Sequence, residues 1–134
     1  MESAKPRAAH LAFGANGENV AAAFMAGRGY AILARNWRHG HLELDLVCEK
    51  NGEIIFVEVK TRRSALYGGG VAAVNTRKQR KLLAASQFWL MENKMWGSPC
   101  RFDVICLYGQ GRDFRMEHYR NAFCQTLDNS HPYW

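Results

Sequence analysis

Carboxylates interrupt two apolar, β-prone runs in residues 43–60, which read ELDLVCEKNGEIIFVEVK. Asn51-Gly52 lies between the runs, and this pair is a strong hairpin signal because a type I′ turn needs positive φ at both central residues. In that hairpin Asp45 lies directly opposite Glu58, with Cβ atoms about 4.5–5.5 Å apart. Two carboxylates this close require a proton or a cation between them. A one-residue bulge would change this register.

The faces of the predicted hairpin follow from the same register. Glu43 would lie opposite Lys60, and Val47 and Phe56 would lie on the acidic face, because side chains alternate along a strand. The opposite face is predicted to carry Leu44, Leu46, Cys48, Ile55, Val57 and Val59.

Glu58-Val59-Lys60 places a carboxylate and an ammonium group on one face of its strand. Together with Asp45 this set suits Mg²⁺ or Mn²⁺, which prefer carboxylate oxygens and accept phosphate oxygens as further ligands. Such an ion can activate a water and offset charge on an attacked phosphate, while Lys60 orients the nucleophile or stabilises the developing charge. The competing interpretation is a solvated outer face on which Glu43 and Lys60 form a simple ion pair.

Basic residues are concentrated close to these acids. The chain has a net charge of +6, and the segments 60–63 and 77–81 hold seven of its eighteen Lys and Arg residues. Such runs are usually solvated, but they can also contact phosphates and make binding salt-dependent. The predicted nucleic-acid contacts are Arg62, Arg63, Arg77, Lys78 and Lys81.

The chain as a whole is typical of one cytoplasmic domain spanning residues 1–134. Its 134 residues suffice for a single core. No apolar run reaches the roughly 20 residues of a membrane span, and the first residues lack a secretory pattern. The four cysteines show no CxxC spacing, and Cys48 and Cys106 lie in apolar strand patterns, which favours reduced, buried thiols over a zinc site with His39 or His41.

The elements that must position these side chains alternate between helix and strand. Helices are predicted at 11–28, ended by Gly29, and at 75–94, begun by a capping box of Thr76 and Gln79. Strands are predicted at 30–37, at 101–108 and at 114–119 in addition to the hairpin at 42–60, with residues 1–9 and 125–134 as loose ends. The order α-β-β-β-α-β-β predicts an α/β fold with a mixed sheet flanked by helices, since the second helix permits a parallel crossover.

The spacing Asp45…Glu58-Val59-Lys60 resembles the PD-(D/E)XK nuclease superfamily, and the wider pattern resembles the bacterial YraN-like proteins, related to archaeal Holliday-junction resolvases. Leu42 stands where that family usually has Gly. The matching pieces are Gly14-Ala15-Asn16-Gly17-Glu18, Arg35-Asn36-Trp37-Arg38, Glu43-Leu44-Asp45-Leu46, Phe56-Val57-Glu58-Val59-Lys60-Thr61-Arg62, Arg77-Lys78-Gln79 and Arg101-Phe102-Asp103.

This resemblance implies a restriction-endonuclease-like core in which Glu18 joins Asp45, Glu58 and Lys60 at the catalytic site. The expected activity is Mg²⁺- or Mn²⁺-dependent hydrolysis of DNA phosphodiesters, with branched DNA as the implied substrate structure and the Val59 carbonyl as a further ligand. Resolvase-like enzymes cut two strands, which implies a homodimer. The alternatives are a non-catalytic nucleic-acid-binding module, with RNA left open, and an acidic docking surface for a basic protein.

Overall fold

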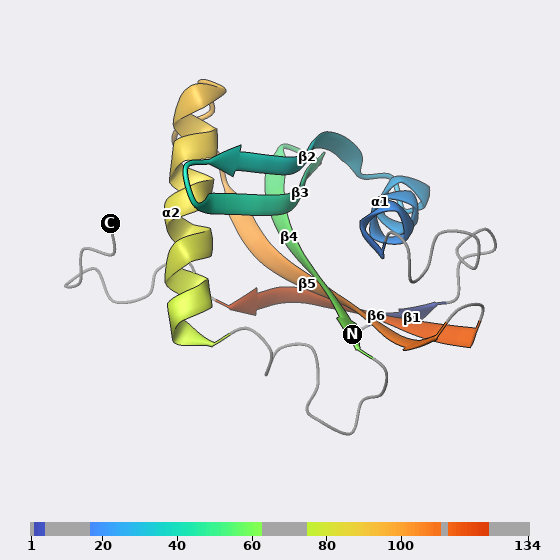
Figure 1. The fold of residues 1–134 in the computed structure, drawn as a ribbon. Helices are drawn as coiled ribbons and strands as arrows, with labels where there is room; N and C mark the ends of the chain where they lie inside the picture. Colours follow the sequence, from blue (N-terminus) through green and yellow to red (C-terminus); the bar gives the residue numbers. More distant parts are fainter. Residues whose placement is uncertain (1, 5–16, 63–74, 111–112, 124–134) are drawn as a thin grey trace.

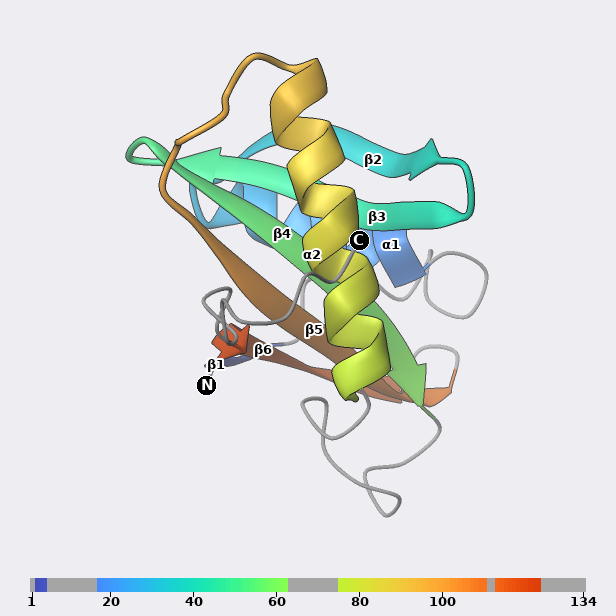
Figure 2. The ribbon, with the colours of Figure 1, turned by 90° about the vertical axis from the view of Figure 1, so that its left-hand side faces the viewer.

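The computed structural model describes residues 2–4, 17–62, 75–110 and 113–123. In these residues six strands form one sheet, with one helix on each face (Figures 1 and 2). The elements are β1 (Glu2–Ala4), α1 (Gly17–Gly27), β2 (Ala31–His39), β3 (Leu42–Lys50), β4 (Glu53–Arg62), α2 (Thr76–Glu92), β5 (Cys100–Gln110) and β6 (Asp113–Phe123).

The sheet is mixed, with strand order β1-β6-β5-β4-β3-β2. β4 and β5 are parallel, and the other neighbouring pairs are antiparallel. Since α2 connects the two parallel strands, it crosses one face of the sheet, and α1 covers the other (Figure 1). The predicted α/β class and the order α-β-β-β-α-β-β from α1 onward are confirmed.

Residues 2–4 differ from the prediction of a loose N-terminus. They form β1, which pairs with β6 and so extends the sheet at that edge. Residues 125–134, like the predicted helical stretch 11–16, lie outside the described residues. β6 is longer than the predicted 114–119, because its pairing with β5 continues past a bulge to Phe123.

The β3–β4 hairpin has the predicted turn. Asn51 and Gly52 have φ of 53° and 82°, and the predicted pairing of Lys50 with Glu53 is observed. The register then runs without interruption to Leu46 opposite Val57. The turn chemistry of the sequence was therefore sufficient to set the strand pairing.

Each face of the sheet carries its own apolar core. Leu46, Cys48, Ile55 and Val57 pack beneath α1, as the alternation predicts. Leu44 does not: it packs beneath α2 together with Val47, Phe56 and Trp89. The alternation along β3 therefore changes phase between Leu44 and Leu46, and the residue at the change is Asp45.

The start of α2 differs from the predicted capping box. Asn75 is the N-cap, and its side-chain oxygen accepts a hydrogen bond from the backbone N–H of Lys78 at 2.9 Å. Thr76 is thus the first helical residue rather than the cap. Asn is as good an N-cap as Thr, and Lys78, the third helical residue, contacts Glu58 of β4.

Two further expectations concern the whole chain. Within the described part of the chain, neither helix has the length and apolar character needed to cross a bilayer. Among the described cysteines, Cys48 and Cys106 are buried as expected, and Cys100 is partly exposed.

Candidate functional site

Asp45 lies where β3 and β4 separate. The ladder between the two strands ends at Leu46 and Val57, one pair short of the predicted Asp45–Glu58 pairing. Beyond that point the Asp45 carboxylate accepts a hydrogen bond from the Val59 N–H at 2.8 Å. The Asp45 side chain thus replaces a backbone carbonyl of β3 as the acceptor for the Val59 N–H. This hydrogen bond fixes the carboxylate where the two strands separate.

The carboxyl groups of Asp45 and Glu58 nevertheless meet, as the hairpin register predicted. Burial, the hydrogen bond to Glu58 and the charge on Glu58 outweigh the opposing effect of the Val59 N–H, and together they raise the pKa of Asp45 to about 8. At neutral pH Asp45 therefore carries a proton that it shares with Glu58. This is the expected state of two neighbouring carboxylates that hold no cation between them.

Glu58 is the buried member of the pair, with 4% of its surface exposed. Burial alone would raise its pKa, but the hydrogen bond from Asp45 and the charges of Lys78 and Lys60 hold the pKa below its ordinary value. The Glu58 Oε2 atom lies 3.4 Å from the Lys60 Nζ and 3.2 Å from the Lys78 Nζ. Glu58 is thus ionised and shared by one lysine of its own strand and one of α2.

Lys78 was predicted as one of several phosphate contacts, and the structure places its ammonium group in an ion pair with Glu58. Because Lys78 lies in the first turn of α2, the positive end of the helix dipole also faces this site. No local signal in the sequence indicates this contact, because it depends on how α2 packs against β4.

Glu18 lies near the pair without joining it. It is partly buried in the first turn of α1, and its charge contributes to the raised pKa of Asp45. The close approach of this turn to β4 depends on Gly17, where an added Cβ would lie 2.8 Å from the Thr61 Cγ2. In the described residues no three His, Cys, Asp or Glu side chains are grouped closely enough to hold a metal ion together.

The donor chemistry of the pair fits a hard divalent cation. Asp45 and Glu58 supply carboxylate oxygens, the ligands that Mg²⁺ and Mn²⁺ prefer. The proton held between them marks the place that a cation would take, since metal binding requires deprotonated ligands. Two carboxylates with several retained waters are a common ligand set for Mg²⁺.

Other predicted residues of the site have different positions. Glu43 does not face Lys60: the β3–β4 ladder stops before it, and Glu43 instead pairs with Arg38 of β2 at 3.5 Å. Arg62, Arg77 and Lys81 are exposed at the end of β4 and the start of α2, which lie at the same end of the molecule (Figure 2). Arg63 lies outside the described residues.

Arg101 and Asp103, which belong to the last matching piece of the family pattern, form an ion pair. The Arg101 Nε donates to the Asp103 Oδ1 at 2.9 Å, and His118 and the Asn121 N–H also bind this fully buried carboxylate. Burial would raise the pKa of Asp103, but these hydrogen bonds outweigh it and hold the pKa below its usual range.

The fold and the site define a small α/β protein with a mixed sheet and a carboxylate pair bound by two lysines. A family model described as "Uncharacterised protein family UPF0102" matches residues 17–107, and the chain belongs to this family. The match covers Glu18, the hairpin, α2 and most of β5, and it confirms the predicted membership of the YraN-like group.

Individual relatives extend the similarity to most of the chain. A UPF0102 protein of Oleidesulfovibrio alaskensis is 46% identical over 104 residues, which are 78% of this chain and 52% of that protein. A UPF0102 protein of Nitratidesulfovibrio vulgaris is 40% identical over 128 residues, 94% of this chain and 96% of that protein. The corresponding protein of Lawsonia intracellularis is 38% identical over 123 residues, with 90% and 93% covered. The chain spans about half of the first relative and nearly all of the other two.

Proposed function

We propose that this chain is a divalent-metal-dependent nuclease with a restriction-endonuclease-like core, a member of the PD-(D/E)XK superfamily that hydrolyses DNA phosphodiester bonds. The observation that carries the proposal is the meeting of Asp45 and Glu58 beside Lys60 at the place where β3 and β4 separate. If Asp45 and Glu58 had only a structural role, placing their carboxyl groups so close that they share a proton would not stabilise the fold.

Each residue has a distinct task in this proposal. Asp45 and Glu58, with the Val59 carbonyl and Glu18 nearby, would hold Mg²⁺ or Mn²⁺. When bound, the ion would stabilise negative charge on the phosphate and promote attack by water. Lys60 would donate a hydrogen bond to the attacking water or to the charge that develops on the phosphate.

Lys78 adds a second cation to the same site. Its ammonium group lies 3.2 Å from Glu58, so it lies within reach of a phosphate bound at the pair. The exposed residues Arg62, Arg77 and Lys81 would hold the DNA backbone on either side, by contacts that weaken as salt rises.

The experiment is a nicking assay on branched and linear DNA with Mg²⁺, with Mn²⁺ and with a chelator. Asp45→Asn and Lys60→Ala should abolish cleavage at matched DNA binding, because each removes a group needed at the reacting phosphate. Glu43→Gln is the matched control, since Glu43 is an exposed acid of the same strand that pairs with Arg38. Equal cleavage by all four proteins, or none by any, would exclude the nuclease.

One observation favours a second function, a non-catalytic nucleic-acid-binding module. Glu58 is already neutralised by Lys60 and Lys78, and no third acid joins the pair in the described residues. Such a module would bind DNA or RNA with the same salt dependence and would not cleave either. Its affinity for Mg²⁺ would be no higher than that of the Asp45→Asn variant.

We further propose a homodimer, because cutting two strands symmetrically requires two sites. Sedimentation with and without branched DNA tests this directly. A monomer under both conditions at micromolar concentration would contradict it.

A further inference from the structure

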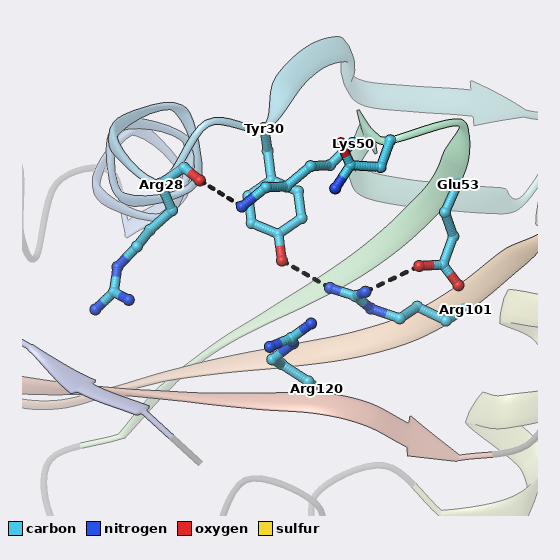
Figure 3. A pocket seen from close by; sticks show the side chains of 7 residues that line it. Arg28, Tyr30, Lys50, Glu53, Arg101 and Arg120 are labelled. Atoms are coloured by element: carbon cyan, nitrogen blue, oxygen red, sulfur yellow. Dashed lines mark hydrogen bonds and ion pairs between the residues drawn. The ribbon is translucent and has the colours of Figure 1, made fainter.

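A second polar site lies at the other end of the β3–β4 hairpin. Lys50 is five residues from Asp45 along β3, which is about 16 Å at the rise of an extended strand. Here a hollow of about 350 Å³ opens between α1, the hairpin turn and the edges of β5 and β6 (Figure 3). We call it the basic pocket, and its lining includes Arg28, Tyr30, Lys50, Glu53, Arg101 and Arg120.

The basic pocket has an excess of positive charge. Four cationic side chains line it, against one lining carboxylate, Glu53, and one buried carboxylate behind the wall, Asp103. The excess is therefore two positive charges. Three strands and the turn after α1 contribute the cations, so the sequence shows no run of basic residues at this place.

Arg101 forms a rigid wall of the pocket. Its guanidinium donates to Asp103, to Glu53 at 3.0 Å and to the Tyr30 hydroxyl at 2.8 Å (Figure 3). Burial would lower the pKa of Arg101, but the bonds to Asp103 and Tyr30 raise it above its ordinary value. The Arg101 side chain is therefore already fixed in position, and a ligand can bind beside its charge without moving it.

The Lys50 side chain is also held in a defined position, and its ammonium group has N–H donors left for a ligand. Its Nζ donates to the Arg28 carbonyl at 2.8 Å and lies 4.7 Å from the centre of the Tyr30 ring. An ammonium group has three N–H donors, so one such bond leaves two. Arg120, from β6, is exposed and reaches toward Tyr30 and Arg101 from the opposite wall (Figure 3).

We propose that the basic pocket binds a phosphate monoester, the terminal phosphate of a nucleotide or of a nucleic-acid strand. A phosphate monoester carries close to two negative charges and three acceptor oxygens, which matches the charge excess and the donors of Lys50 and Arg120. The rest of the ligand also has space, since a second hollow of about 530 Å³ adjoins the pocket and shares Glu53, Arg101 and Arg120 with it.

The test is calorimetric titration of the full chain, without divalent ions, by inorganic phosphate, deoxyadenosine 5′-monophosphate and deoxyadenosine. The monophosphate is expected to bind and the nucleoside is not. Arg120→Gln and Lys50→Gln should each weaken binding of the monophosphate at least tenfold. Arg115→Gln is the matched control, because it removes the same charge from an exposed position of the same strand, and it should change the affinity less than twofold.

Two results would overturn the inference. One is no heat of binding for either phosphate at millimolar concentration. The other is equal weakening by Arg115→Gln and Arg120→Gln, which would reveal only a general charge effect. Since neither measurement involves Mg²⁺ or cleavage, both are independent of the proposed nuclease activity.

A second arm identifies the source of the phosphate. Single-stranded DNA with a 5′-phosphate is compared with the same strand bearing a 5′-hydroxyl, for the wild type and for Arg120→Gln. Tighter binding of the phosphorylated strand, lost in Arg120→Gln, would assign a strand end. Equal binding of the two strands alongside binding of the monophosphate would assign a free nucleotide.

Discussion

Binding of a divalent cation at the Asp45–Glu58 pair is expected to release a proton near neutral pH. The two carboxyl groups share one proton because burial and the neighbouring Glu58 raise the pKa of Asp45 to about 8. A group with this pKa is about 0.9 protonated at pH 7 and about 0.1 protonated at pH 9. The cation takes the place of the proton, so about 0.9 proton per ion should leave at pH 7 and about 0.1 at pH 9.

The same competition determines how the affinity depends on pH. Below the pKa the proton must be displaced, so the apparent affinity for the ion falls as the pH falls. With a pKa of about 8 for Asp45, the affinity for Mg²⁺ or Mn²⁺ should increase about 50-fold from pH 6 to pH 8 and little above pH 9.

Calorimetry in buffers of different ionisation enthalpy counts the released protons directly. Asp45→Asn keeps the shape of the side chain but leaves no proton to displace, so any residual binding should release none. Glu43→Gln should behave as the wild type does. Tight binding of the ion by the wild type at pH 6 with no proton release would refute the shared proton and the site built on it.

Two substitutions and one labelling experiment test how the fold supports the two sites. Gly17→Ala should destabilise the protein by about 1–3 kcal/mol in urea denaturation, because the added Cβ would lie 2.8 Å from a side-chain methyl of β4. Asp103→Asn should cost about 3–5 kcal/mol in the same measurement, since it removes the buried charge that pairs with Arg101. Cys48 should resist a thiol reagent at pH 8 until the chain unfolds, because burial raises its pKa to about 12, and mass spectrometry locates the label.

Each of these predictions has a matched control. Gly27→Ala adds the same methyl to the same helix where nothing lies within 4 Å, so a similar loss there would contradict the packing explanation. Glu53→Gln removes the more exposed partner of Arg101 and should cost less than Asp103→Asn. Cys100 is partly exposed and should be labelled before Cys48.

The hairpin and its acidic pair were predictable because their causes are local. Asn51-Gly52 selects a two-residue turn, the turn sets the register, and the register brings Asp45 to Glu58. What the register could not predict is that the ladder stops at Leu46 and Val57. Beyond that pair Asp45 replaces a backbone partner, and the alternation along β3 changes phase.

The unpredicted parts of both sites depend on contacts between distant segments. Lys78 reaches Glu58 because α2, which connects two parallel strands, crosses the sheet face beside β4. Arg28, Lys50, Arg101 and Arg120 are 22 or more positions apart except for the last two, and no periodicity connects them. Local propensity contains no information about such assemblies, so only the fold shows them.

The two polar sites are formed at the two ends of one hairpin by opposite arrangements. At the turn the strands are tightly paired, so Lys50 and Glu53 are held at fixed positions in the wall of a pocket with excess positive charge. At the far end the strands separate, and the space between them is taken by Asp45 and Glu58, which repel each other unless a proton or a cation lies between them. The two proposals therefore assign an anion to one end and a cation to the other. A nucleic-acid strand with a terminal phosphate and a scissile phosphate would use both, at a separation that the length of the hairpin sets.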